Sequence, residues 1–394
     1  MNILRAWLVV CLLTLVGPIQ AMDDVVEIAA ARPGVFHHLE ASGRSSLALA
    51  GAAVALVWED NRSGSPGCYL ALRTGPAQSF REFSFGRDEC YEPAIAAYDS
   101  HRFLLIWEDA TGVNVALADA NGPGPATQLA ASGGQGSLAV HAGLGALAAW
   151  SAPDGRWRRV WLAPLSFDGS KVVGAGAYPA DATPAADDQT YPVLAAAAQG
   201  LALVWEDRRH GHTVIYGSHS ADAKTWSTPA RVSGNPTGKQ AGDLGRGSGA
   251  MRPAQAAFGP RIAAVWLDKR DFLSGYDVYA ALTEPGSLRF AKDAKAQDSF
   301  GDAIAQWHAA VAGNARGDLV IAWDDERDGS TDIWLTRLTA AGYGENFTLP
   351  ATSGPGRQSD PAIALDAAGN LHLAWIERDA SEQSRLRYTR LPAH

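Results

Sequence analysis

The chain contains few cysteines, no extended cluster of basic residues and little that could cross a membrane. Only three cysteines occur among 394 residues, and one of them, Cys11, lies in an apolar N-terminal segment. No later stretch is long and apolar enough to predict a transmembrane segment. Lys and Arg form no extended run, and the formal net charge is −9. This acidity argues against nucleic acid or an anionic membrane surface as a partner.

The first 21 residues have the pattern of a secretory signal peptide. Arg5 gives a positive start, residues 6–17 form an apolar stretch too short to span a bilayer, and Ile19-Gln20-Ala21 is a suitable cleavage site. We expect cleavage near Ala21 and a secreted or periplasmic protein. Loss of Arg5 changes the formal charge from −9 to −10, because residues 1–21 contain no other charged side chain.

Cys68 and Cys90 are the two cysteines that remain after such cleavage. An even number of cysteines in an oxidising compartment predicts one disulfide. Two free buried thiols are the alternative.

A tryptophan at the end of an apolar run, followed by charged residues, recurs along the chain. Leu203-Val204-Trp205-Glu206-Asp207-Arg208-Arg209 is the clearest copy. The seven tryptophans in such runs are Trp58, Trp107, Trp150, Trp205, Trp266, Trp323 and Trp375, spaced 43 to 61 residues apart. Repeats of about 40–50 residues are typical of propeller blades.

Each repeat can be divided into four short strands. A small, Ala-rich strand such as Pro192-Val193-Leu194-Ala195 precedes the apolar run into Trp, and two further strands follow the charged turn. We therefore predict one domain over residues 22–394, an all-β, seven-bladed β-propeller of four-stranded antiparallel blades. A six-bladed ring with one stray repeat is the alternative, because the repeat around Trp150 is weak.

The two ends of the mature chain complement each other. One strand, around residues 386–389, follows Trp375, so the last blade lacks an outer strand. Residues 25–28 precede the first blade and have no blade of their own. Pairing of these two segments would close the ring and protect both sheet edges.

Asp and Arg recur two residues apart in the turn after the tryptophan. The pairs, here called the Asp/Arg turns, are Asp60/Arg62, Asp207/Arg209, Asp268/Arg270 and Asp325/Arg327. Both side chains can leave the turn on one side, bind its amides and bridge to the next blade. We interpret them as structural, since one asymmetric site would not need so many copies; a charged ring that grips a ligand is the alternative.

The segment Ser220-Ala221-Asp222-Ala223-Lys224-Thr225-Trp226 resembles the Asp-box (BNR repeat) of sialidase-type propellers. In that motif the Asp folds back onto the amides of a hairpin turn. Together with the Trp-Glu-Asp-x-Arg repeats, it makes the chain similar to bacterial secreted proteins grouped with sialidase-like propellers. The resemblance implies a six-bladed fold that cleaves sialosides with an arginine triad, a Tyr–Glu nucleophile pair and an Asp acid.

The first arginine of that triad normally lies in a Phe/Tyr-Arg-Ile-Pro motif. This chain has no such motif; its nearest early arginines are Arg32 and Arg44. The absence favours a binding protein over an enzyme. If the site is catalytic, the resemblance suggests Tyr191 with Glu92 as the nucleophile pair and Asp360 as the acid.

Candidate ligand-binding residues stand just before the inner strands, where the loops reach the channel mouth. They are Glu92, Tyr191, Arg252, Trp307, His308 and Asp360. These residues differ from blade to blade, and together they offer both charges and aromatic rings, which suit a sugar or an anionic small molecule. Ordinary loop polarity around a water-filled channel is the alternative.

No pattern predicts a metal site or a cofactor. His37-His38 and His210-Gly211-His212 lack a further ligand at a telling spacing. We predict a binding protein for a carbohydrate or another extracellular ligand at the channel mouth. A glycoside hydrolase of sialidase-like type and a scaffold for protein partners are the alternatives.

Overall fold

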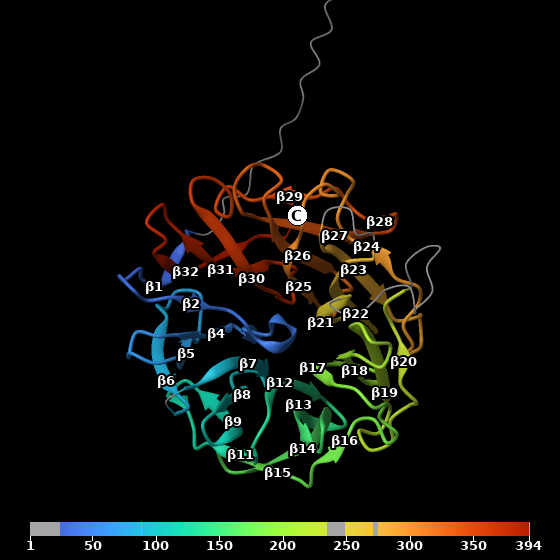
Figure 1. Ribbon diagram of the computed structural model, residues 1–394. Coiled ribbons are helices and arrows are strands. Elements are labelled where there is room, and N and C mark those ends of the chain that lie inside the picture. The colour runs from blue at the N-terminus through green and yellow to red at the C-terminus, as the bar shows by residue number, and fades with distance from the viewer. Residues whose placement is uncertain (1–23, 88, 235–248, 271–274, 394) are drawn as a thin grey trace, which may run out of the picture.

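Seven antiparallel sheets are arranged in a ring around a central axis (Figure 1). This is a computed structural model, and it describes residues 24–87, 89–234, 249–270 and 275–393. The ring confirms the seven-bladed prediction and shows the six-bladed alternative to be wrong. The segment interpreted as a signal peptide lies outside the described residues. Within those residues, no helix is long and apolar enough to cross a membrane.

The strands follow each other from the channel outwards in every blade. Blade 1 contains β2 (His37–His38), β3 (Leu47–Ala50), β4 (Ala53–Asp60), β5 (Gly67–Arg73) and β6 (Arg81–Phe85). Blade 2 contains β7 (Tyr91–Ala97), β8 (Phe103–Asp109), β9 (Gly112–Asp119), β10 (Gly122–Pro123) and β11 (Thr127–Ala130). Blade 3 contains β12 (Gly134–His141), β13 (Gly145–Asp154), β14 (Trp157–Asp168), β15 (Lys171–Gly174) and β16 (Tyr178–Pro179).

The remaining blades repeat this order. Blade 4 contains β17 (Gln189–Ala197), β18 (Gly200–Asp207), β19 (Val214–Ser220) and β20 (Ala230–Arg231). Blade 5 contains β21 (Ala250–Phe258), β22 (Arg261–Asp268), β23 (Asp277–Leu282) and β24 (Ala294–Lys295). Blade 6 contains β25 (Trp307–Gly313), β26 (Leu319–Asp325), β27 (Asp332–Thr339), β28 (Gly342–Tyr343) and β29 (Phe347–Thr348). Blade 7 contains β30 (Arg357–Leu365), β31 (Leu371–Arg378), β32 (Ser384–Leu391) and β1 (Val26–Ala29).

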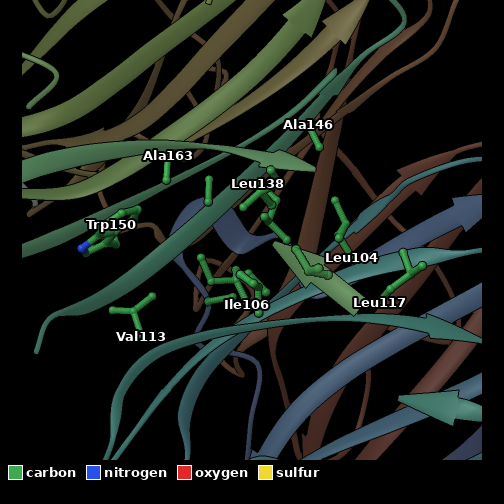
Figure 2. Packing of buried hydrophobic residues seen from close by; sticks show 14 of the residues in the cluster. Leu104, Ile106, Val113, Leu117, Leu138, Ala146, Trp150 and Ala163 are labelled. Atoms are coloured by element: carbon green, nitrogen blue, oxygen red, sulfur yellow. The ribbon is translucent and has the colours of Figure 1, made fainter. Parts of the chain in front are cut away.

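The core lies between neighbouring blades. Leu104 and Ile106 of blade 2 pack with Leu138 and Trp150 of blade 3 in one buried cluster (Figure 2). The second strand of each blade is apolar on both faces because each face covers a neighbouring blade. This explains the continuous apolar runs in the sequence.

The N-terminal strand closes the ring. In β1, Val26 pairs with Tyr388 and Glu27 with Arg387 of β32, so the blue and red ends of the chain lie side by side (Figure 1). The prediction that residues 25–28 complete the last blade is confirmed. Every blade therefore has its outer strand, and neither terminal strand is left as an open edge.

Cys68 and Cys90 form the predicted disulfide. Their Cα atoms are 5.5 Å apart, and the bond joins β5 to the segment after β6 within blade 1. Both cysteines are buried. The bond is consistent with an oxidising, extracellular compartment.

The inner strand of blade 1 is interrupted by residues 39–46, here called the channel segment. It contains a short 3₁₀ helix, η1 (Ser42–Arg44), which reaches the inner strands of blades 4 and 5 at the ring centre (Figure 1). The Ser42 hydroxyl donates to the carbonyl of Pro192, 2.9 Å away. Gly43 has φ of 70°, and a Cβ there would lie 2.7 Å from a methyl group of Val193. The sequence patterns did not predict this crossing, because they placed the first inner strand only from about residue 47.

Candidate functional site

One residue of each blade at the channel mouth has a left-handed backbone conformation. These seven residues, here called the mouth residues, are Arg44, Glu92, Gln135, Tyr191, Arg252, His308 and Asp360, with φ between 45° and 59°. In blades 2 to 7 each lies at a register shift of the inner strand. The sequence placed its candidates in feeding loops; the structure places them at bulges inside strands. Left-handed conformations of bulky residues are costly and cluster at functional sites.

Hydrogen bonds between blades hold these conformations. The backbone N–H of Glu92 donates to Glu59, 3.0 Å away, and that of Arg252 donates to Glu206, 2.7 Å away. The N–H of Asp360 donates to Asp324 at 3.0 Å. Each acceptor directly follows the repeated tryptophan of the preceding blade. In blades 1, 4 and 6, the acid after the tryptophan therefore fixes the position of the next blade's mouth residue.

A cavity of about 180 Å³ opens at the channel mouth. It is lined by Glu40, Ala41, Ser42, Gly43, Arg44, Tyr191, Met251, Arg252, Pro253, Leu267, Trp307, His308 and Ala309. The channel segment supplies one part of the wall, and blades 4, 5 and 6 supply the rest. Four of the six predicted ligand-binding residues meet in this one pocket. Glu92 and Asp360 do not line it; Asp360 contacts Arg44 and His308 of the lining, and Glu92 interacts electrostatically with Arg252.

Aromatic rings and a guanidinium form one side of the pocket. The guanidinium carbon of Arg252 lies 4.0 Å from the centre of the Tyr191 ring. Trp307 is 41% exposed and packs against the ring of Tyr276 at 5.3 Å, with the two rings tilted by 60°. Such contacts hold both flat groups in place before a ligand arrives.

Ionic contacts connect the other side of the pocket. Nη2 of Arg44 lies 3.1 Å from Oδ1 of Asp360, and Nδ1 of His308 lies 2.7 Å from Oδ1 of Asp324. Burial alone would raise the pKa of Asp360, but His308 and Arg44 outweigh it and hold that pKa below its ordinary value. Burial alone would lower the pKa of His308, whereas the carboxylates of Asp324 and Asp360 raise it. Asp360 is therefore ionised at neutral pH.

In contrast to Asp360, several buried glutamates have raised pKa values, among them Glu92 and Glu206. Burial, followed by repulsion from Glu108, raises the pKa of Glu92 to about 8, although Arg252 acts in the opposite direction. Burial raises the pKa of Glu206 to about 7. Oε2 of Glu92 is buried and has no hydrogen-bond partner among the described residues. At neutral pH, Glu92 is a protonated acid beside the pocket.

Three potential metal ligands approach one another in this region. One ligand atom each from Glu40, His308 and Asp360 lies within 4.8 Å of the others. Arg44 already occupies Asp360 at 3.1 Å, and a guanidinium that close competes with a cation. The positive charge beside Asp360 is therefore supplied by the guanidinium of Arg44, which disfavours a metal ion here.

The Asp/Arg turns form a recurring set of contacts. The indole N–H of Trp205 donates to Asp207 at 3.1 Å, and Nη2 of Arg209 donates to the same carboxylate at 2.7 Å. The corresponding indole–carboxylate distances are 2.8 Å for Trp58/Asp60, 3.0 Å for Trp266/Asp268 and 2.9 Å for Trp323/Asp325. The corresponding Arg62, Arg270 and Arg327 also bind the Asp of their own turn.

Each arginine of these turns also lies over a third-strand ring. The guanidinium of Arg209 is 4.1 Å from the centre of Tyr216, and that of Arg327 is 4.2 Å from Trp334. No pattern in the sequence predicted these aromatic partners. The contacts favour the structural interpretation of the turns, which stays a prediction.

The Asp-box-like segment has the turn geometry that its sequence suggests. Oδ1 of Asp222 accepts from the backbone N–H groups of Lys224 and Thr225 at 2.8 Å and 2.7 Å. These bonds, together with one from Ser220, hold the pKa of Asp222 below its ordinary value. The segment begins at Ser220, the last residue of β19, away from the channel mouth.

Sequence reasoning missed several residues of the site. Glu40 and Gln135 were not singled out, and Glu206 was seen only as part of the repeat. The nearest available signal was the residue after each tryptophan, which is acidic in blades 1, 2, 4 and 6. Glu40 carried no signal, because the channel segment has no counterpart in the other repeats.

Comparison with known proteins gives likeness of fold at low sequence identity. No protein-family model matches the chain, and no curated protein matches it. The phage phi92 endosialidase superposes with a TM-score of 0.55 and 6% identity, covering 94% of this chain and 69% of the endosialidase chain. The α-L-arabinofuranosidase Arb93A from Fusarium graminearum superposes with a TM-score of 0.50 and 13% identity, covering 94% and 98% of the two chains. These likenesses show a propeller fold shared with carbohydrate-processing proteins.

Proposed function

We propose that this protein is a glycoside hydrolase that binds a carbohydrate in the channel-mouth pocket. From the sequence alone, a binding protein was the main prediction and a glycoside hydrolase was an alternative. Two solved structures of similar fold, an α-L-arabinofuranosidase and an endosialidase, act on glycosides, which supports a carbohydrate as the ligand class. The pocket offers what a sugar requires, namely an exposed ring, fixed charges and hydrogen-bonding groups.

The state of Glu92 carries the proposal. Its carboxyl group is protonated at neutral pH because its pKa is about 8, and its buried Oε2 has no partner among the described residues. A glycosidic oxygen needs a proton as its bond to the sugar breaks, and a buried carboxyl group with a raised pKa supplies one. We assign Glu92 as the general acid.

Asp360 provides the complementary charge. It is ionised, and Arg44 and His308 fix its orientation. Hydrolysis of a glycoside pairs one protonated with one ionised carboxyl group, because positive charge develops on the sugar ring as the bond breaks. The family resemblance suggested Asp360 as the acid and Glu92 as part of the nucleophile pair. In this proposal Glu92 is the acid and Asp360 is the ionised carboxylate. The low pKa of Asp360 does not suit an acid, and burial raises the pKa of Tyr191, which disfavours the phenolate of a nucleophile.

Arg252 and Trp307 position the substrate in this proposal. The indole of Trp307 stacks on the apolar face of a sugar ring, and the guanidinium of Arg252, held over Tyr191, donates to its oxygens. The channel segment lines the same pocket.

Binding without turnover is the second candidate function. The observation in its favour is that Arg44 and His308 both neutralise Asp360, which leaves less negative charge to stabilise a cationic sugar. The two functions make different predictions for Glu92.

The test combines turnover and binding on the same variants. Purified protein is assayed on fluorogenic arabinofuranosides and sialosides, on debranched arabinan and on polysialic acid, with calorimetry on the same unlabelled sugars. Glu92→Gln should abolish turnover and retain affinity, while Glu345→Gln, at an exposed position, changes neither. Binding without turnover in the wild type would instead establish the binding function. No binding and no turnover with any of these sugars would contradict both.

A further inference from the structure

We propose that the face around the channel mouth binds a carbohydrate chain of several linked sugars through exposed aromatic side chains in the pocket and beyond it. This inference rests on the proposed function, because it extends the pocket's ligand from one sugar to a polymer.

Four aromatic side chains are strongly exposed among the described residues. Phe36 is 48% exposed, Tyr91 36%, Phe300 63% and Trp307 41%. Burying such a ring against a partner is favourable, and a large exposed ring is informative where several share one face.

All four lie on the rim that carries the pocket. Tyr91 and Trp307 begin inner strands and pair with the ends of the second strands that lead into the turns at the mouth. The backbone N–H of Phe36 donates to Asn61, in the turn after β4. Phe300 lies 5.9 Å from the guanidinium of Arg327, in the turn after β26.

The other two exposed large apolar residues among the described residues are Val25 and Val173. Val25 directly precedes β1, the outer strand of blade 7. Val173 is 41% exposed and belongs to β15, which pairs with the end of β14 towards the opposite rim. The aromatic side chains belong to blades 6, 1 and 2, which with blade 7 form one continuous arc. An elongated ligand that leaves the pocket along this arc would pass Phe300 in blade 6 and, beyond blade 7, Phe36 and Tyr91.

Two of the four exposed rings, those of Trp307 and Phe300, pack against a second aromatic ring. Trp307 packs edge-on against Tyr276 at 5.3 Å, and Phe300 lies 6.4 Å from the ring of Trp334. Rings held in this way stack on a flat sugar face with little loss of side-chain freedom. Trp307 also lines the pocket, so the surface is continuous with the site that takes the first sugar.

A length series tests the proposal. Calorimetry measures the affinity of the wild type for arabino-oligosaccharides and oligosialic acids from two to eight units. We expect affinity to rise with length beyond the units that fill the pocket. Phe300→Ala and Phe36→Ala should each weaken binding of the longest oligosaccharides about three- to tenfold and leave the shortest unchanged. Val173→Ala serves as the matched control on the opposite side and should change nothing.

The outcomes separate this proposal from the proposed function. Equal affinity at all lengths, or aromatic variants that bind the longest chains as the wild type does, would overturn the extended surface while the pocket function stands. The aromatic face would then be assigned to a protein partner. If none of the oligosaccharides binds at any length, both the extended surface and the pocket function are overturned for these sugars.

Discussion

The guanidinium carbon of Arg252 lies 4.0 Å from the centre of the Tyr191 ring, across the boundary between blades 5 and 4. The two residues occupy equivalent positions in adjacent blades, and both have a left-handed backbone. The contact turns two separate strand bulges into one wall of the pocket.

Replacing Arg252 tests whether this wall binds the ligand. Arg252→Ala should weaken sugar binding by roughly ten- to a hundredfold, because a charged donor and a flat contact are both lost. Arg252→Lys should recover only part of the loss, since an ammonium group keeps the charge without the planar fork. Calorimetry measures affinity and thermal melting reports folding. Arg289→Ala, at an exposed position, is the control; equal affinity of Arg252→Ala and wild type would place the site elsewhere.

Asp207 tests the structural role of the Asp/Arg turns. Asp207→Ala removes the acceptor shared by the Trp205 indole and Arg209, and its site is buried. We expect the free energy of unfolding to fall by about 1–3 kcal/mol in urea titrations. Asp154→Ala, at an exposed position, should cost little. Loss of sugar binding with unchanged stability would identify the turns as a ligand site.

The pH dependence of turnover tests the assignment of Glu92. Its pKa of about 8 means that the group is protonated below that pH and loses its proton above it. Turnover that needs the protonated acid should therefore fall as pH rises through about 8. A pH–rate profile of kcat/KM for a sugar that the wild type cleaves measures this alkaline limb. Turnover that stays constant up to pH 10 would exclude Glu92 as the proton donor.

Two buried histidines at the ring closure predict loss of stability in acid. Burial lowers the pKa of His37 and His372 to about 4 in each case, against an opposing effect of nearby Asp side chains. His37 contacts Ser384, and His372 contacts Tyr388, which Arg73 of blade 1 also binds. Both histidines therefore support the junction between blades 1 and 7.

The direction of the effect follows from the lowered pKa values. An unfolded histidine takes up a proton near pH 6.5, whereas the folded ones resist it until about pH 4. The stability is present above pH 6.5 and should fall by about 1–3 kcal/mol per histidine as pH drops from 6.5 to 4. Urea unfolding across this range measures the slope. His372→Gln should flatten it, while His101→Gln, at an exposed position, should not.

The sequence by itself determined the blades, the closure and the disulfide. Local patterns carry this information, because an apolar run that ends in Trp205-Glu206-Asp207 makes the same strand and turn wherever it recurs. The unpaired strand at residues 386–389 needed a partner, and residues 25–28 were available to provide it.

The candidate site depended on the tertiary structure. Repeat position predicted that Tyr191, Arg252, Trp307 and His308 share a rim, and the structure places them in one pocket. Nothing local predicted that residues 39–46 leave the first inner strand and cross the channel, since that path is fixed by contacts with blades 4 and 5. The protonation states of the two carboxyl groups likewise depend on which groups the fold places around them. Glu92 and Asp360 are both carboxylic acids near the same mouth. One is desolvated beside other acids, and the other is held between Arg44 and His308.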